Sequence, residues 1–423
     1  MLAMRLDNGG ALLYDPAVMD MFIWDRSRFA KMTPVSKPTP DILYSLGVNA
    51  VRISLGKACN NNCAYCQEKA HSDIPDFYPI TADIKHVMKE LRHVLQNKGE
   101  DLITLELWGG EPLLYFDTIK EIIESFHERT FAKQIKWHLT TNGLLLDEDV
   151  HAYVIKHNIE VVLSHDGPGQ VNRGVDILDG PQKELISDLM KRNLLYISSV
   201  ITNESISHLH ILRYFQKLFP PDVLKLYEGI PLQINDISYL KYTPFRDNLL
   251  EYTDAFYDAL VNHRIDQHFK LVHSLLGMAL NELSLPAKPV YGAKCRSNHP
   301  SKFCIDLNGK LINCHSYTDG DFTIFGESCA YGTLADFSVG REPDRCVGFY
   351  NDPGCANCPV LFFCRGACPQ NDRQLHEYDC KVKFAHHLAI LKALIHSLTN
   401  RHLVQIEGDY KFSGCDRLPL QSK

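Results

Sequence analysis

Short apolar runs alternate with longer amphipathic runs between Val51 and about Leu240. The short runs are rich in β-branched residues and predict strands, and the long ones have helical apolar spacing. The predicted strands are AVRISL (50–55), LITLELW (102–108), IKWHLTT (135–141), IEVVLSH (159–165), LYISSVIT (195–202) and IPLQIND (230–236). The predicted helices cover residues 81–97, 116–129, 147–158, 181–193 and 206–219. This alternation predicts an α/β fold in which six βα units form a partial (β/α)6 TIM-like barrel at residues 49–240.

The regular pattern stops after the barrel. Gly, Pro and Cys become dense from Pro286 onward, which predicts a module held together by metal sites more than by an apolar core. A last helix is expected from about Val382 to Leu398. The parts outside the barrel are an N-terminal segment without an assigned role at 1–48, a helical bridge at 241–287, a cysteine-rich module at 288–384 and a C-terminal helix and tail at 385–423.

Composition narrows the class of protein. The net charge of −7 argues against a dedicated nucleic-acid binder, which would usually be basic. The N-terminus lacks the basic start and apolar run of a signal peptide, and the last predicted helix is interrupted by Lys392 and too short to span a bilayer. We therefore expect a cytoplasmic protein without membrane contact. Its 14 cysteines, in a reducing compartment, favour metal or cluster binding over disulfides.

Three cysteines lie within eight residues in GKACNNNCAYCQE, directly after the first predicted strand. Cys59, Cys63 and Cys66 are an incomplete set for a structural zinc, which would recruit a fourth nearby ligand. The nearest candidate is His71, and the next cysteine is Cys295. A [4Fe–4S] cluster is the alternative, because it can take three thiolates and leave its fourth iron open. Both interpretations, and free thiols, remain open on this motif alone.

Distinctive sequences follow each of the next three strands. In barrel enzymes the reacting groups lie at the C-terminal ends of strands, so these motifs should face one cavity. Paired glycines let the backbone approach a ligand closely, and hydroxyl, amide and carboxylate groups read sugar hydroxyls. Taken singly, each motif is equally compatible with ordinary turn or capping chemistry. The residues are Gly109, Gly110, Glu111 and Pro112 in WGGEPLL, Thr140, Thr141 and Asn142 in HLTTNGLL, and Ser164 and Asp166 in LSHDGPGQVNR.

Through CNNNCAYC, GGEP, TTNG and LSHDGP the chain resembles the radical S-adenosylmethionine (SAM) enzymes. The resemblance implies that the three cysteines bind a [4Fe–4S] cluster whose open iron is chelated by SAM. It implies that Glu111, Pro112 and the glycines meet the amino group of SAM, and that Tyr65 lies beside the adenine. Ser164, Asn142 and Asp166 would face the ribose side, and Arg173 the carboxylate. Reductive cleavage would then give a 5′-deoxyadenosyl radical that takes a hydrogen atom from the substrate.

The C-terminal cysteines resemble the SPASM extension of some radical SAM enzymes, with a zinc ribbon as the alternative. The resemblance implies two auxiliary clusters, and three [4Fe–4S] clusters in all. Cys329, Cys346 and Cys415 fall outside the pattern as structural thiols, although one of them, such as Cys415, could donate a hydrogen atom. The implied ligands are Cys295, Cys304, Cys314 and Cys368 for the first auxiliary cluster, and Cys355, Cys358, Cys364 and Cys380 for the second.

The SPASM resemblance implies a peptide or small-protein substrate and a reductant such as flavodoxin or ferredoxin. We expect a maturase of ribosomally made peptides that forms a crosslink or another oxidative modification. The alternative is an anaerobic sulfatase-maturating enzyme, although that branch has aspartate where this chain has His315, a candidate acid/base. An iron–sulfur electron carrier or zinc scaffold without radical chemistry is the alternative from another class, and the intact GGEP argues against it.

Overall fold

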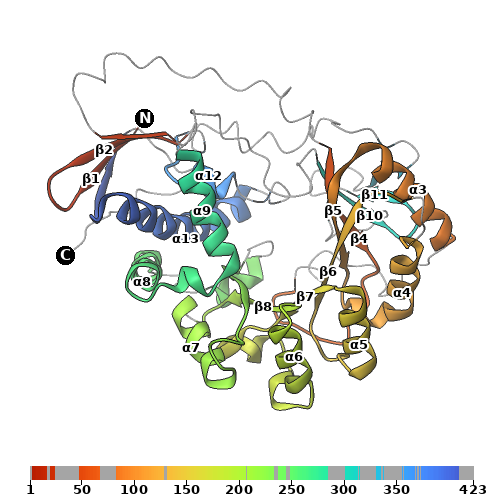
Figure 1. The fold of residues 1–423 in the computed structure, drawn as a ribbon. Coiled ribbons are helices and arrows are strands. Elements are labelled where there is room, and N and C mark those ends of the chain that lie inside the picture. Colours follow the sequence, from red (N-terminus) through yellow and green to blue (C-terminus); the bar gives the residue numbers. More distant parts are fainter. Residues whose placement is uncertain are drawn as a thin grey trace.

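The computed structural model describes most of the barrel and parts of the C-terminal region. Figure 1 shows a barrel-like array of strands surrounded by helices, with a helical layer and a small separate sheet beside it. The described residues are 2–16, 20–23, 47–66, 82–127, 131–205, 207–232, 237–243, 248–283, 301–312, 314, 330–334, 337, 355, 357–366, 368, 371 and 373–408. The PVSKPTPD stretch at 34–41 lies outside them.

Six consecutive strands of the main sheet are parallel, as predicted for a partial barrel. Their alternating side chains point either to the helices outside or to the barrel interior. Apolar side chains such as Leu105 and Leu107 are buried on the outer face, whereas Arg52 and Glu106 point inward and form an ion pair at 2.7 Å. The strands are β4 (Val48–Ser54), β5 (Gly99–Trp108), β6 (Gln134–Thr141), β7 (Glu160–Ser164), β8 (Leu195–Ile201) and β9 (Leu226–Pro231).

Five helices connect these strands and cover the outside of the sheet (Figure 1). Their starts are set by local capping: the Asp83, Asp147 and Ser207 side chains each accept a hydrogen bond from a backbone N–H in the first turn. Each helix buries one apolar stripe, which explains why their periodicity was readable in the sequence. The helices are α3 (Ile84–Lys98), α4 (Phe116–Ser125), α5 (Glu148–His157), α6 (Gln182–Lys191) and α7 (His208–Leu218).

The sixth strand differs from its predicted position at 230–236. It begins at Leu226 and ends at Pro231, and residues 233–236 lie outside the described part. Glu228 and Gly229 separate Leu226 and Tyr227 from the apolar run on which the prediction relied. Glu228 accepts a hydrogen bond from Ser198 Oγ at 2.9 Å inside the barrel, and a Cβ on Gly229 would lie 3.0 Å from the His208 ring. At both positions, packing at the barrel edge accounts for the residue type, and a preference for strand conformation does not.

The cysteine-rich region adds three strands to the other edge of the same sheet. β10 (Lys302–Asp306) pairs in parallel with β4, and the antiparallel strands β11 (Lys310–Ile312) and β12 (Ala330–Thr333) follow. The sheet order is therefore β12-β11-β10-β4-β5-β6-β7-β8-β9. The C-terminal region and the barrel thus share a continuous sheet, while the exact domain limits stay predictions.

A layer of helices lies beside the barrel. The bridge forms α8 (Leu249–Asn262) and α9 (Lys270–Leu283), and the last long helix, α13, covers Arg373–Thr399. α13 begins nine residues earlier than expected from about Val382, because Cys380 and several charged residues in its first turns hide the apolar pattern. It packs on α8 through the hydrogen bond from Thr253 Oγ1 to Ala385 O at 3.0 Å. A short helix, α12 (Leu361–Cys364), lies close to it.

The two ends of the described chain meet in a four-stranded antiparallel sheet. Its order is β13-β1-β2-β3, formed by Leu403–Glu407, Leu2–Leu6, Ala11–Asp15 and Asp20–Ile23 respectively. Arg5 and Glu407 form an ion pair across it at 2.9 Å. In Figure 1 this sheet lies next to α13, away from the barrel. The N-terminal segment, which had no predicted role, therefore completes the fold around the C-terminal helix.

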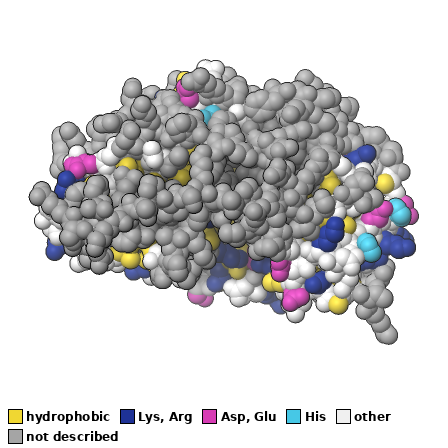
Figure 2. Space-filling model, turned by 90° about the horizontal axis from the view of Figure 1, so that it is seen from above, with side chains coloured by type: hydrophobic (Ala, Val, Ile, Leu, Met, Phe, Trp, Pro, Cys, Tyr) yellow, Lys and Arg dark blue, Asp and Glu magenta, His cyan; other side chains and the backbone are white. Residues whose placement is uncertain are grey.

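The surface carries charges of both signs. Figure 2 shows Lys, Arg, Asp, Glu and His side chains intermingled at the barrel end of the molecule. Among the described residues, His86 and Glu90 on α3 form one such surface pair at 3.5 Å. No helix in that part of the chain is both long and apolar enough to cross a membrane.

Candidate active site

The three cysteines Cys59, Cys63 and Cys66 lie in a tight loop directly after β4, which we call the cysteine loop (residues 56–66). All three side chains are partly exposed. The loop closes on itself, because Cys66 N–H donates to Cys63 O at 3.3 Å and Asn61 N–H to Cys59 Sγ at 3.4 Å. Burial raises the pKa of the Cys63 thiol, while Arg173 opposes this shift. The predicted position at the C-terminal end of the first barrel strand is thus observed.

Two glycines fasten the end of β5 to the cysteine loop. Gly110 N–H donates to Gly56 O at 2.9 Å, and Glu111 N–H donates to Ala58 O at 2.8 Å. A Cβ on Gly109 would lie 2.6 Å from Gly56 O, and one on Gly110 would lie 2.3 Å from Lys57 O. No side chain fits at either position. The close backbone approach expected of paired glycines is therefore present, and its partner in this structure is the cysteine loop.

The Glu111 carboxylate braces β5 against β6. It is only 1% exposed, and it accepts hydrogen bonds from Leu113 N–H at 2.9 Å, Thr141 Oγ1–H at 2.6 Å and Asn142 N–H at 2.7 Å. Burial raises the pKa of Glu111, although these hydrogen bonds oppose the shift. Pro112 follows in the first position of a 3-10 turn, η2 (Pro112–Tyr115). Glu111 is therefore placed by three donors from two loops at the mouth of the barrel.

Asn142 reaches from the end of β6 to the cysteine loop. Its amide Nδ2 donates to Asn60 Oδ1 at 2.8 Å and lies 4.0 Å from Cys59 Sγ. Its Oδ1 accepts from Leu144 N–H at 2.9 Å, which fixes the turn after the strand. Thus the ends of β4, β5 and β6 are joined by polar contacts around the three cysteines, and an interaction of Asn142 with a ribose stays a prediction.

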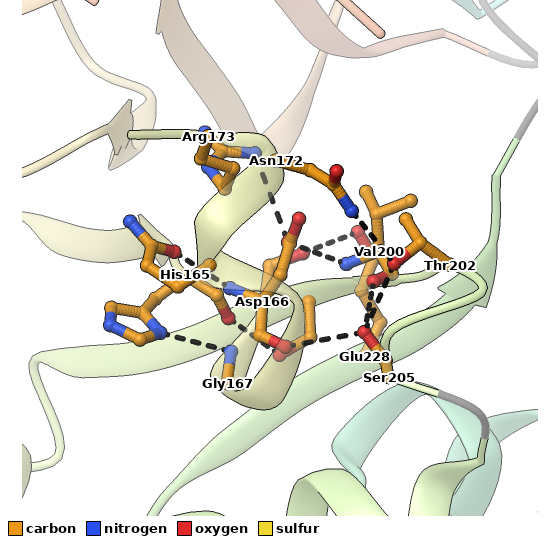
Figure 3. A network of polar contacts seen from close by, with 12 residues as sticks. His165, Asp166, Gly167, Asn172, Arg173, Val200, Thr202, Ser205 and Glu228 are labelled. Carbon is orange, nitrogen blue, oxygen red and sulfur yellow. Dashed lines mark hydrogen bonds and ion pairs between the residues drawn. The ribbon is translucent and has the colours of Figure 1, made fainter. Parts of the chain in front are cut away.

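Asp166 and Arg173 lie beside the same cysteines, after β7. Figure 3 shows the Asp166 side chain between Arg173 and Val200, with dashed lines to both. The fully buried Asp166 accepts from Val200 N–H at 2.9 Å, and Arg173 Nη1 lies 3.9 Å from its Oδ1. Burial raises the pKa of Asp166 to about 6 despite these two neighbours. The Arg173 charge also acts on the cysteine triplet. Ser164, at the end of β7, is partly buried.

A network around His165 was not predicted, although the residue stands inside the LSHDGP motif. His165 Nε2 donates to Asp176 Oδ1 at 2.8 Å, and its Nδ1 accepts from Gly167 N–H at 3.0 Å, an arrangement that assigns the ring tautomer. Tyr214 Oη–H donates to Asp176 Oδ2 at 2.8 Å. Burial would raise the pKa of Asp176, but the hydrogen bonds from His165, Leu178 and Tyr214 lower it to about 2. The network holds the turn that carries Asp166 and Arg173.

Three buried polar atoms around the triplet have no hydrogen-bond partner in the described part of the chain: Tyr65 Oη, Asp166 Oδ2 and Arg173 Nε. Tyr65 packs edge-on against Tyr242, with ring centroids 6.2 Å apart, and Tyr239 Oη–H donates to Cys66 O at 2.8 Å. Buried polar groups in native proteins are almost always hydrogen-bonded, so such atoms indicate a polar ligand or water. Together with three convergent thiols, they fit a cluster and a zwitterionic cofactor.

Four C-terminal cysteines surround one cavity, which we call the C-terminal cysteine pocket: Cys355, Cys358, Cys364 and Cys380. They are the set predicted for the second auxiliary cluster. Cys358 N–H donates to Cys355 O at 3.0 Å in the turn before α12. Burial raises the pKa of the Cys358 thiol, and the neighbouring Cys364 adds to this effect. The donor set and its shared cavity fit an iron–sulfur cluster. Among the described residues, no three His, Cys, Asp or Glu side chains are arranged around a single metal ion.

The first auxiliary set is described only in part. Cys304 is buried within β10, where it pairs with Ile312, and Cys314 and Cys368 are partly exposed. Other predicted residues lie outside the described residues, so their roles stay predictions: His71, Cys295, His315, Cys329, Cys346 and Cys415.

Comparison with protein families identifies the class. Residues 53–171 match the radical SAM superfamily, a range that includes the cysteine loop, Glu111 and Asp166. The chain therefore contains a radical SAM domain, as its motifs predicted. The expected fold, an α/β partial barrel followed by a cysteine-rich C-terminal region, is confirmed.

Individual relatives are more distant. The radical SAM cyclopropyl synthase TigE of Paramaledivibacter caminithermalis is 22% identical over 346 residues, which is 76% of this chain and 68% of the relative. A cysteine-type anaerobic sulfatase-maturating enzyme of Clostridium perfringens is 26% identical over 226 residues, covering 48% of this chain and 59% of the relative. This chain is thus similar to both and is close to neither.

Two solved structures share the fold. Native anSMEcpe with bound AdoMet and the Cp18Cys peptide has a TM-score of 0.59 and 20% identity, covering 84% of this chain and 99% of that one. Streptococcus suis SuiB bound to the precursor peptide SuiA has a TM-score of 0.50 and 15% identity, covering 88% and 97%. These likenesses extend beyond the barrel and support the same overall fold.

Proposed function

We propose that the protein is a radical SAM/SPASM maturase that oxidatively modifies a ribosomally made peptide. The carrying observation is the cysteine loop at the end of β4, joined to Glu111 and Asn142 within the radical SAM domain. A zinc scaffold would not need the buried carboxylate brace or the orphaned polar atoms around the thiols. The separate C-terminal cysteine pocket would supply the second element that such an oxidation requires, an electron acceptor.

The residues of the barrel mouth would bind and orient the cofactor. Cys59, Cys63 and Cys66 would hold a [4Fe–4S] cluster by three thiolates, leaving one iron for S-adenosylmethionine. Arg173 would supply a positive charge for its carboxylate, backbone carbonyl oxygens around Glu111 would accept from its amino group, and Tyr65 offers a hydroxyl. When bound, the cluster and cofactor supply a 5′-deoxyadenosyl radical.

The atom balance favours an oxidative product. One hydrogen atom leaves the substrate with 5′-deoxyadenosine, and a further proton and electron must leave to complete the loss of two hydrogens. The proton passes to water or a base, and the electron to an oxidised auxiliary cluster at the C-terminal cysteines. A low-potential one-electron protein such as flavodoxin or ferredoxin would reduce the first cluster. We expect such an enzyme to work in the cytoplasm, where thiols stay reduced.

The peptide substrate is supported by the neighbours. SuiB is known with its precursor peptide SuiA, and anSMEcpe with the Cp18Cys peptide. Their fold covers most of this chain. This similarity supports the substrate class and does not name the bond that is formed.

Sulfatase maturation is the second candidate, favoured by the similarity to the anaerobic sulfatase-maturating enzyme. In that reaction a serine or cysteine of a protein would become an aldehyde, formylglycine. His315 would then take the place of the aspartate expected in that branch. An aldehyde can be captured by a hydrazide reagent, whereas a crosslink cannot, so the two candidates give separable products.

The test is anaerobic co-expression of the enzyme with each small protein encoded beside it, followed by mass spectrometry. The matched control is Cys63→Ala, which removes one ligand of the first cluster. Loss of two hydrogens from one small protein, only with the wild-type enzyme and without hydrazide capture, would support peptide crosslinking or dehydrogenation. Hydrazide capture would support formylglycine formation. Failure of the reconstituted enzyme to form 5′-deoxyadenosine would instead favour an electron carrier or scaffold.

A further inference from the structure

One face of α13 forms a wall of the C-terminal cysteine pocket. His376, Cys380 and Phe384 line the pocket and are spaced four residues apart, so they lie one above another on the helix. Asp379 and Lys383 each precede one of these residues. They therefore lie on the adjoining face of the helix, next to the cavity.

Asp379 and Lys383 form an ion pair that is shielded from water. Lys383 Nζ donates to Asp379 Oδ2. The Lys383 side chain is 16% exposed and the Asp379 side chain 1%. The second oxygen, Asp379 Oδ1, is buried without a hydrogen-bond partner among the described residues. Removing two charges from water costs free energy, and apolar residues at these two positions would pack equally well without that cost. This pair therefore suggests a use for the charge itself.

The charge of Lys383 acts on the cysteines. Burial alone would lower the pKa of Lys383, but Asp379 and the sulfurs of Cys364 and Cys368 raise it above its usual value. Lys383 thus remains protonated at neutral pH. The geometry agrees, because Phe384, the next residue on α13, lines the same cavity as Cys364 and Cys380.

A fixed positive charge near an iron–sulfur cluster stabilises the reduced form, which carries one more negative charge. Reduction potentials of such clusters depend on net charge, hydrogen bonds to sulfur and solvent exposure. In a shielded site the interaction between charges is screened less than in water. A cation at this position should therefore raise the potential and favour acceptance of an electron.

We propose that Lys383, held in place by Asp379, raises the reduction potential of the auxiliary cluster bound in the C-terminal cysteine pocket, so that this cluster accepts one electron from the substrate radical. This inference rests on the proposed function, which supplies the electron as the radical also loses a proton to water. Lys383 acts here as a tuning residue that touches neither substrate nor cofactor. Nothing in the reaction requires it to change its own protonation.

The test is an electron paramagnetic resonance redox titration of the full chain, in a background where Cys59, Cys63 and Cys66 are all alanine. That background leaves only the signals of the auxiliary clusters. We expect Lys383→Met to lower the midpoint potential enough to change the ratio of reduced to oxidised cluster at least tenfold at a fixed potential, about 59 mV for one electron. Lys383→Arg should stay near the parent value. Asp379→Asn, which removes the opposing negative charge, should shift the potential upward.

Lys217→Met on α7 is the control, because this exposed lysine carries the same charge far from the cysteines. It should leave the midpoint unchanged. Equal potentials in the parent, Lys383→Met and Asp379→Asn chains, at equal iron content, would overturn the proposal. Loss of the clusters in all three variants, Lys383→Arg included, would assign the pair to holding the cysteines and would also overturn it.

The titration uses neither S-adenosylmethionine nor peptide, so its outcome is separable from the proposed function. Opposite shifts without any cleavage of S-adenosylmethionine by the wild-type enzyme would overturn the maturase function and leave the tuning role standing. Absence of any cluster signal from the background chain would overturn the tuning role alone.

Discussion

The cysteine loop is fastened by polar contacts, whereas the C-terminal cysteine pocket is walled largely by apolar side chains. At the barrel mouth, Glu111 and Asn142 tie three strand ends to the loop. In the pocket, Val360, Leu361 and Phe384 stand between the cysteines. Both regions place thiols around a common centre, but among the described residues hydrogen-bonding groups predominate around the first and apolar side chains around the second.

This difference corresponds to two kinds of task. A site that receives a polar cofactor needs donors, acceptors and charges held in place before binding, which is what the strand ends supply. A site that only stores an electron needs complete ligation, a shielded surrounding and a suitable nearby charge. The first region is therefore expected to fail when one hydrogen bond or backbone contact is changed, and the second mainly when a ligand is lost.

Removing one thiolate from each region should give the largest effects and tests whether the two regions have separate roles. We expect Cys63→Ala to abolish formation of 5′-deoxyadenosine, because two thiolates cannot hold the cluster that leaves an iron open for the cofactor. Cys358→Ala should retain that cleavage and lose the modified peptide, because the electron then has no acceptor. Chromatography of 5′-deoxyadenosine and mass spectrometry of the peptide, measured on the same reactions, check both results. Equal loss of cleavage in the two variants would show that the regions are not independent.

Adding a single methyl group at Gly110 should also disable the barrel mouth. The new Cβ would lie 2.3 Å from Lys57 O and 2.5 Å from Ala58 O, which are backbone atoms and cannot move aside without shifting the cysteine loop. We expect Gly110→Ala to lower cleavage of S-adenosylmethionine at least tenfold. Gly277→Ala is the matched control, because nothing lies within 4 Å of that position on α9. Wild-type cleavage by Gly110→Ala would refute the close-contact argument.

Removing one donor from Glu111 tests the brace by stability. Thr141→Val keeps the shape of the side chain but removes the hydroxyl that donates to the buried carboxylate and accepts from Gly143 N–H. A hydrogen bond to a charged group contributes about 1.5–3 kcal/mol, so the free energy of unfolding should fall by roughly that amount. Anaerobic urea unfolding measures it. Thr140→Val, on the opposite face of the same strand, should change stability far less.

The barrel was predictable because its signals are local. Alternating apolar runs and capping residues such as Asp147 place strands and helices within a few residues of their observed positions. The last barrel strand was misplaced because Glu228 and Gly229 are there for tertiary contacts, and α13 was predicted too short because Cys380 and charged residues interrupt the apolar pattern of its first turns. Both differences result from packing between residues that are far apart in the sequence, which a short stretch of sequence does not reveal.

The sequence predicted which residues belong to the candidate site better than it predicted the contacts that they make. The motifs named Glu111, Asn142 and Asp166, yet in the structure much of their bonding capacity is used within the protein. The resemblance to the SPASM extension also grouped the four cysteines of the C-terminal pocket. The His165–Asp176 contact and the ion pair of Lys383 were not foreseen, because their partners become neighbours only through a turn or a helix face.

The smallest expected effect concerns the pH dependence of stability at the barrel mouth. Burial raises the pKa of Asp166 from the model-peptide value of 3.8 to about 6 in the folded protein. The folded state therefore binds the proton more tightly than the unfolded state. Stability from this group is fully present below about pH 4 and is lost as the pH rises through 6. Between pH 5 and pH 7 the loss should be about 1 kcal/mol.

Asp166→Asn should remove this slope, because the amide does not titrate, and chemical unfolding of the anaerobic protein at pH 5, 6 and 7 measures it. Asp176→Asn is the matched control in the same turn. The pKa of Asp176 is lowered to about 2, so its charge is constant over this window and its removal should lower stability equally at each pH. An unchanged slope in Asp166→Asn would mean that the buried carboxylate is ionised throughout, held by Arg173. The barrel mouth would then keep a full ion pair next to the cysteine loop, and its contrast with the apolar C-terminal pocket would be sharper still.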